Sequence, residues 1–325
     1  MKWLRVLCGA VMAMALGLGP VGAAGAAPRT DPAAGTSAAS ASAADEAATL
    51  AYWTPERMEA TWAAQEGREG AGRGAGAAAK QDAAVEAATA RFAADRSLRS
   101  SVDKTVGRVF YVNTETQLPE ACSASALNSP SRMMVITSAH CAAVGGSRMN
   151  GGEAKWFKRT WVYVPAVNGG DPYPYGKFTW KLGRVFNDWL DTANAFDSDV
   201  AMITVNPNAE GKRLVDATGA NGLVVNQRDE VTVTAVGYPG NLDNGAYQVE
   251  CTGTLERLIL YPILLEMPCR LLGHGASGGP WLWTDPQTLR TSVNGVTRSH
   301  DGVEIDTPYF DDRVVSMYNE QGSVT

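Results

Sequence analysis

The chain has 325 residues, with 28 basic and 34 acidic side chains, so its formal net charge at pH 7 is −6. Residues 1–101 hold ten charges of each sign, so the negative excess belongs entirely to residues 102–325. A mildly acidic region without a Lys/Arg cluster argues against nucleic acid as the main partner.

Residues 1–26 have the composition of a secretory signal peptide. Lys2 and Arg5 precede an apolar run at 6–18, and small residues follow at 24–26. The apolar run is too short to span a bilayer stably. We therefore expect a secreted, extracellular protein with no membrane association once the signal is removed.

Residues 27–101 are rich in Ala and Gly, and such a composition buries too little apolar surface to order itself. Residues 52–58 are the exception, because an aromatic pair is followed by Pro55 just inside a helix start. Residues 78–98 favour helix but carry few large side chains. The segment is predicted to be of low order, and either a pro-segment or a linker fits it.

Residues 102–325 contain short apolar segments separated by Gly, Pro, Asn and Asp, which is typical of β-strands and turns. No amphipathic helix separates the segments, and no clear helix is indicated near the C-terminus. The region is long enough for one substantial core, and its regularly spaced short strands predict an all-β antiparallel barrel class. The expected strands are 108–112, 121–127, 133–137, 155–164, 177–186, 199–205, 231–236, 246–260, 263–267 and 292–297.

Three stretches of this region carry residues suited to nucleophilic catalysis. His140 ends the apolar run 134–139, Asp199 opens the run 200–205, and Ser277 lies in Gly-Ala-Ser-Gly-Gly-Pro. A serine hydroxyl needs a base that removes its proton and a third group that orients this base. Glycines around the serine allow backbone N–H groups to converge on a developing oxyanion.

Two other carboxylates compete for the role of the orienting acid. Asp191 and Asp197 lie close to Asp199 in the sequence, but only Asp199 directly precedes an apolar strand, where a carboxylate is buried. Asp199 is therefore the preferred acid.

In their order and local context, these three stretches resemble the trypsin/chymotrypsin-like serine peptidases, and residues 52–58 resemble a segment of exported actinobacterial members. The resemblance implies two six-stranded antiparallel β-barrels and a monomeric secreted endopeptidase that acts on polypeptides without a cofactor or metal. It implies that His140 is the general base and acid, that Asp199 orients it, and that Ser277 attacks the carbonyl. The N–H groups of Gly275 and Ser277 would form the oxyanion hole.

The resemblance defines the specificity pocket less well than it defines the three catalytic residues. Ala276 replaces the aspartate that pairs with a newly cut N-terminus in trypsin, so activation by that ion pair is excluded. Residues 237–240 resemble the glutamyl endopeptidases, but Thr297 stands where those enzymes have histidine. An exposed, solvated side chain is favoured for Arg298. The pocket for the residue before the scissile bond is expected at Leu271, Leu272, His274, Thr297 and Arg298.

Four cysteines remain once Cys8 leaves with the signal peptide, and an even number in an exported protein favours disulfides. Four cysteines allow three connectivities. The resemblance implies that Cys122 pairs with Cys141, which leaves Cys251 to pair with Cys269. Zinc is disfavoured because no Cys-x-x-Cys motif is present.

Two other functions fit parts of the sequence. The serine stretch also fits the nucleophile elbow of α/β-hydrolases, but those enzymes place the acid and the histidine after the serine, and only His300 follows Ser277. A catalytically silent binding or adhesion module with the peptidase fold is the main alternative to an endopeptidase.

Overall fold

The computed structural model describes residues 35–71 and 102–324. The predicted signal peptide at 1–26 and the predicted helical stretch at 78–98 lie outside the described residues.

Six antiparallel strands close into a β-barrel in the order β6-β5-β2-β3-β4-β7, because β6 pairs with β7 as well as with β5. Its interior is filled by large side chains such as Tyr163, Trp161 and Trp180, all almost fully buried. Burial on both faces explains why these segments read as nearly continuous apolar runs. The prediction of an antiparallel barrel is confirmed for these strands: β2 (Val106–Val112), β3 (Pro119–Leu127), β4 (Met134–Thr137), β5 (Val162–Pro165), β6 (Phe178–Phe186) and β7 (Ala201–Val205).

The C-terminal strands form two sheets that share one apolar core, which includes Val233, Met267, Trp281 and Ile305. The pairings given for the described residues do not join these sheets into a second closed barrel, so that closure remains a prediction. One sheet contains β8 (Gly222–Leu223), β9 (Thr232–Gly237), β10 (Val249–Thr254), β13 (Pro280–Thr284) and β14 (Thr291–Val296). The other contains β11 (Glu256–Arg257), β12 (Leu264–Pro268), β15 (Ser299–His300) and β16 (Glu304–Pro308).

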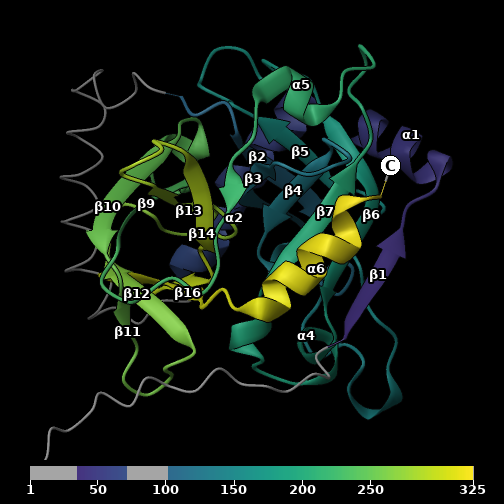
Figure 1. Cartoon of the computed structure of the whole chain (residues 1–325). Coiled ribbons are helices and arrows are strands. Elements are labelled where there is room, and N and C mark those ends of the chain that lie inside the picture. Colours follow the sequence, from purple (N-terminus) through teal and green to yellow (C-terminus); the bar gives the residue numbers. More distant parts are fainter. Residues whose placement is uncertain (1–34, 72–101, 325) are drawn as a thin grey trace, which may run out of the picture. The chain divides into compact units, whose positions relative to one another are not determined.

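Helix α6 (Asp312–Gly322) lies against β6 and β7 (Figure 1), although no clear helix is indicated there by the sequence. Asp311 caps its first turn by accepting a hydrogen bond from the Arg313 N–H, and Val314 and Met317 bury its apolar face. The acidic cap followed by this short apolar spacing is the signal that could have identified the helix. None of the described helices is long and apolar enough to cross a membrane.

Residues 35–71 are ordered, which corrects the prediction of low order for this part of the chain. Strand β1 (Thr36–Ser40) extends the barrel sheet by pairing with β6. Helix α1 (Ala43–Tyr52) begins with a capping box, and helix α2 (Pro55–Ala71) begins at the proline as predicted. The composition averaged over residues 27–101 does not reveal that the segment contains a few large side chains that are buried. Two of these, Trp53 and Trp62, are at most 1% exposed.

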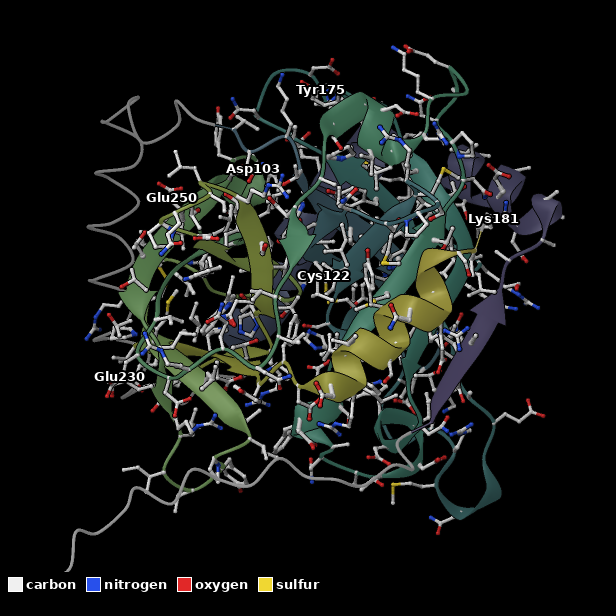
Figure 2. All side chains as sticks on the ribbon, in the orientation of Figure 1. Asp103, Cys122, Tyr175, Lys181, Glu230 and Glu250 are labelled. Carbon is white, nitrogen blue, oxygen red and sulfur yellow. A yellow bond between two sulfur atoms is a disulfide. The ribbon has the colours of Figure 1, made fainter. Side chains whose placement is uncertain are left out.

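Shorter helical turns connect the strands and complete the described elements. They are η2 (Ala139–Cys141), η3 (Met149–Gly151), α4 (Asn187–Asp191), η4 (Phe196–Ser198), α5 (Leu214–Thr218) and η5 (Asp243–Gly245). Side chains fill the interior of both groups of strands, and Cys122 lies among them (Figure 2).

Candidate active site

The ends of two paired barrel strands bring His140 and Asp199 together. His140 follows β4 and Asp199 precedes β7, and these strands pair with Thr137 opposite Ala201. One carboxylate oxygen of Asp199 lies 2.7 Å from His140 Nδ1, and the other accepts the backbone N–H of His140 at 2.9 Å. The Asp199 side chain is 3% exposed and that of His140 is 31% exposed. The carboxylate is thus buried, whereas the imidazole reaches the surface.

The competing carboxylates bind elsewhere. Asp191 pairs with Arg148 at 2.7 Å, and Asp197 lies 3.3 Å from Arg313. Of the three candidate acids, only Asp199 contacts His140.

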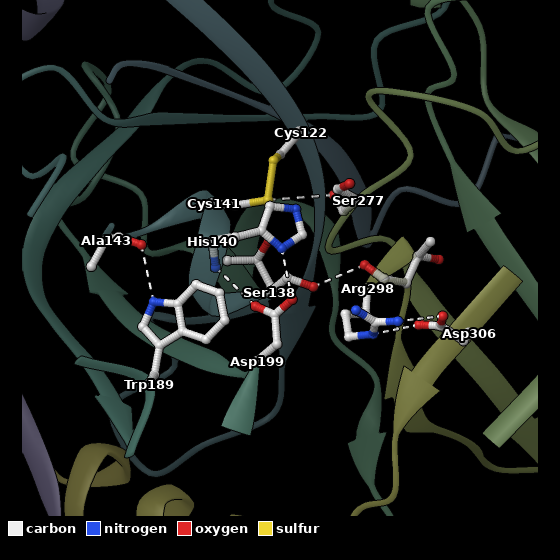
Figure 3. Close-up of polar contacts among 12 residues, drawn as sticks. Cys122, Ser138, His140, Cys141, Ala143, Trp189, Asp199, Ser277, Arg298 and Asp306 are labelled. Carbon is white, nitrogen blue, oxygen red and sulfur yellow. Dashed lines mark hydrogen bonds and ion pairs between the residues drawn. A yellow bond between two sulfur atoms is a disulfide. The ribbon is translucent and has the colours of Figure 1, made fainter. Parts of the chain in front are cut away.

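Ser277 lies in the loop between β12 and β13, beside the same disulfide as His140 (Figure 3). Its carbonyl oxygen is 3.7 Å from Cys141 Sγ, and a ring nitrogen of His140 is within 4.8 Å of this sulfur atom. The carbonyl also accepts the backbone N–H of Ser123 at 2.7 Å. Gly278 has φ +78°, and a Cβ there would collide with Thr137. The site therefore requires glycine directly after the serine.

Two backbone donors of this loop have no acceptor among the described residues. The carbonyl of Gly275 accepts the Ser123 hydroxyl at 2.8 Å, and Gly275 has φ +87°. Within the described part of the chain, the N–H groups of Gly275 and Ser277 have no hydrogen-bond acceptor. Backbone N–H groups without an acceptor next to a serine are what the stabilisation of an oxyanion requires. Ser123, which holds two carbonyls of the loop, has no recognisable motif in the sequence.

The imidazole of His140 lies among groups with opposing effects. Burial lowers the pKa of His140, whereas the charge and hydrogen bond of Asp199 raise it; the charge of Arg298 lowers it and that of Glu120 raises it. The net result is a pKa above the ordinary histidine value.

Arg298 is not solvated, contrary to expectation. Its guanidinium forms a bidentate pair with Asp306, with N–O distances of 2.7 and 2.6 Å, and lies 4.5 Å from the Phe196 ring centroid. Sequence patterns do not reveal this pair, because β15 and β16 must first align the two residues. A cavity of about 430 Å³ is lined by His140, Trp189, Phe196, Asp199, Arg298 and Ser299, among others.

The other residues expected in the pocket have different surroundings. Leu272 is 1% exposed and belongs to the apolar core of the C-terminal strands, where Leu271 packs against it. Thr297 is buried and accepts the indole N–H of Trp281 at 2.9 Å. The ring of His274 lies edge-on to that of His300, with 4.4 Å between centroids.

Both disulfides implied by the resemblance are confirmed, Cys122–Cys141 and Cys251–Cys269. Among the described residues, Cys122, Cys141 and His140 have the proximity of a metal site. The two sulfur atoms are bonded to each other, so they cannot act as thiolate ligands.

Comparison with solved structures identifies similar folds. The protease Anisep from Arthrobacter nicotinovorans has 25% sequence identity and a TM-score of 0.59, over 69% of this chain and 97% of that one. A thermostable serine protease, AL20, from an extremophilic microorganism has 23% identity and a TM-score of 0.58, over 69% of this chain and 99% of that one. No protein-family model and no curated protein matches the sequence.

Proposed function

We propose that this chain, which has the fold of bacterial chymotrypsin-like serine proteases, is a secreted serine endopeptidase that works through an acyl-enzyme. The observation that carries the proposal is the buried Asp199 carboxylate bound to His140, beside a loop in which the N–H groups of Gly275 and Ser277 have no acceptor among the described residues. Two disulfides fit an oxidising, extracellular location.

In the proposed reaction, the Ser277 hydroxyl attacks the carbonyl carbon of the scissile bond while His140 Nε2 accepts its proton. Asp199 accepts a hydrogen bond from Nδ1–H, which keeps Nε2 free as the base and stabilises the imidazolium that forms. The N–H groups of Gly275 and Ser277 bind the oxyanion. His140 then protonates the leaving amine, and a water molecule hydrolyses the acyl-enzyme by the same steps.

Labelling with a fluorophosphonate probe tests the proposal against a silent binding module. We expect the native protein to react at Ser277, as located by peptide mapping, because only an activated serine attacks such a probe. Heat-denatured protein and Ser277→Ala should remain unlabelled, whereas Ser316→Ala, at an exposed position on α6, should label like wild type. Unlabelled native protein would favour the binding module.

The pH dependence of the reaction follows from the raised pKa of His140. The base must be neutral, so kcat/KM is expected to fall about tenfold per pH unit on the acid side, with its midpoint above the ordinary value near 6.5. The protonated imidazolium pairs with Asp199, so this group stabilises the fold below pH 6.5, and that stabilisation is lost as pH rises through the folded-state pKa. A pH–rate profile that is flat between about 5 and 8 would rule out His140 as the base.

A further inference from the structure

Among the described residues, one edge of strand β3 lies beside the candidate nucleophile without a neighbouring strand. β3 pairs with β2 along residues 119–125 and with β4 only from Ser125 onward. On the second edge, Ser123 donates its N–H to the Ser277 carbonyl. Backbone polar groups of alternate residues in an antiparallel strand face the same edge, so the N–H and C=O of Ala121 face this edge too.

The side chain of Gln65, on helix α2, binds both of these groups. Its Oε1 accepts the Ala121 N–H at 2.8 Å, and its Nε2 donates to the Ala121 carbonyl at 3.4 Å. This two-point contact is the one that a residue of an extended peptide makes when it pairs with a strand edge. A peptide cannot pair with Ala121 while Gln65 is bound there.

Trp62, one helical turn before Gln65, packs against the loops that contain Gly275 and Gly245. A Cβ built on Gly275 or on Gly245 would meet its indole ring, and Trp62 is 1% exposed. The ring is also covered by Arg108, whose guanidinium carbon lies 4.7 Å from the ring centroid. Helix α2 thus covers the surface from the edge of β3 to the loop that holds Gly275 and Ser277.

Among the described residues, the cavity lined by His140 and Arg298 does not include Ala121, Gln65 or Trp62. In the view of Figure 3, Cys122, which follows Ala121 in β3, lies above His140, and the Arg298–Asp306 pair lies to its right. A polypeptide whose acyl part lies toward Arg298 would therefore extend its leaving part toward the edge of β3.

We infer that Gln65 and Trp62 are specificity-determining residues that occupy the leaving-group side of the cleft, so that the intact chain favours substrates with short leaving groups. The inference rests on the proposed function. An amide or ester with a small leaving group does not reach Ala121, whereas the second residue of a longer leaving group must displace the Gln65 carboxamide.

The test uses the secreted chain with residues 27–101 retained, and substrates with one common acyl part that is chosen from a peptide-library profile. The leaving groups are p-nitroaniline and segments of one, two and three residues. For wild type, kcat/KM is expected to drop about tenfold or more between leaving groups of one and two residues, because two hydrogen bonds must be replaced. Gln65→Ala should remove most of this drop, measured as the ratio of kcat/KM between leaving groups of one and two residues.

Two further variants test whether the effect comes from the contact between Gln65 and Ala121. Gln65→Glu keeps an acceptor for the Ala121 N–H but loses the donor to its carbonyl, so we expect an intermediate drop. Glu56→Ala, at an exposed position in the first turn of the same helix, should leave the wild-type ratios unchanged. Thermal melts of each variant establish that the fold is retained.

The outcomes separate this inference from the proposed function. A wild-type enzyme that cleaves a three-residue leaving group as fast as the anilide, or a Gln65→Ala variant with unchanged ratios, would overturn the inference alone. A wild-type chain that neither hydrolyses the anilide nor reacts with the fluorophosphonate would overturn both.

Discussion

Asp199→Asn is expected to lower kcat by roughly 10⁴-fold while leaving the protein folded. Asp199 holds His140 by two hydrogen bonds, one to Nδ1 and one to the backbone N–H. An asparagine amide of the same shape can donate to Nδ1, which favours the tautomer with its proton on Nε2, where it cannot accept the Ser277 proton. Steady-state kinetics on a chromogenic substrate, together with circular dichroism, measure the two effects.

Asp191→Asn is the matched control, because Asp191 lies close to Asp199 in the sequence and was also a candidate for the acid that orients His140. Its carboxylate is half exposed and pairs with Arg148, so its removal should change kcat by less than about twofold. If the two variants lost activity equally, the assignment of Asp199 as the orienting acid would be wrong.

Removing the Cys122–Cys141 disulfide with a double Cys→Ala variant is expected to lower the free energy of unfolding by about 3 kcal/mol, mainly because the unfolded chain gains freedom. The Cys251–Cys269 disulfide closes a loop of nearly the same length, with sequence separations of 19 and 18 residues. Its removal should therefore destabilise the fold by a similar amount, as measured by urea denaturation.

The two disulfide variants should differ in activity at temperatures where both are folded. Cys141 follows His140 directly, and its sulfur contacts the Ser277 carbonyl, so loss of this bridge also loosens the candidate active site. The other bridge joins β10 to the residue after β12, within the C-terminal core. Equal kcat values for the two variants would contradict a role for Cys122–Cys141 in positioning His140. Unfolding free energies that are unaffected by reduction would mean that the bridges do not stabilise the protein.

The sequence by itself determined the local features of this protein. Apolar runs broken by Gly, Pro and Asn indicated most strands of the barrel, because a strand that is buried on both faces consists almost entirely of apolar residues. Pro55 marked the start of α2, because proline at the first helical position costs no hydrogen bond. The glycines around Ser277 and the positions of His140 and Asp199 at strand ends indicated the candidate site, because each of these features is visible within a short stretch of the sequence.

Only the tertiary structure decided the features that depend on residues distant in sequence. Arg298 was expected to be solvated, but β16 places Asp306 beside it. The sequence singled out the aromatic pair that contains Trp53 as an exception to low order, but it did not indicate Trp62 or the burial of both indoles against barrel residues. Gln65 is one polar side chain in an Ala-rich segment, and its contact with Ala121 spans 56 positions of sequence. Composition reports what a segment contains, whereas burial and pairing depend on which surface the fold places against it.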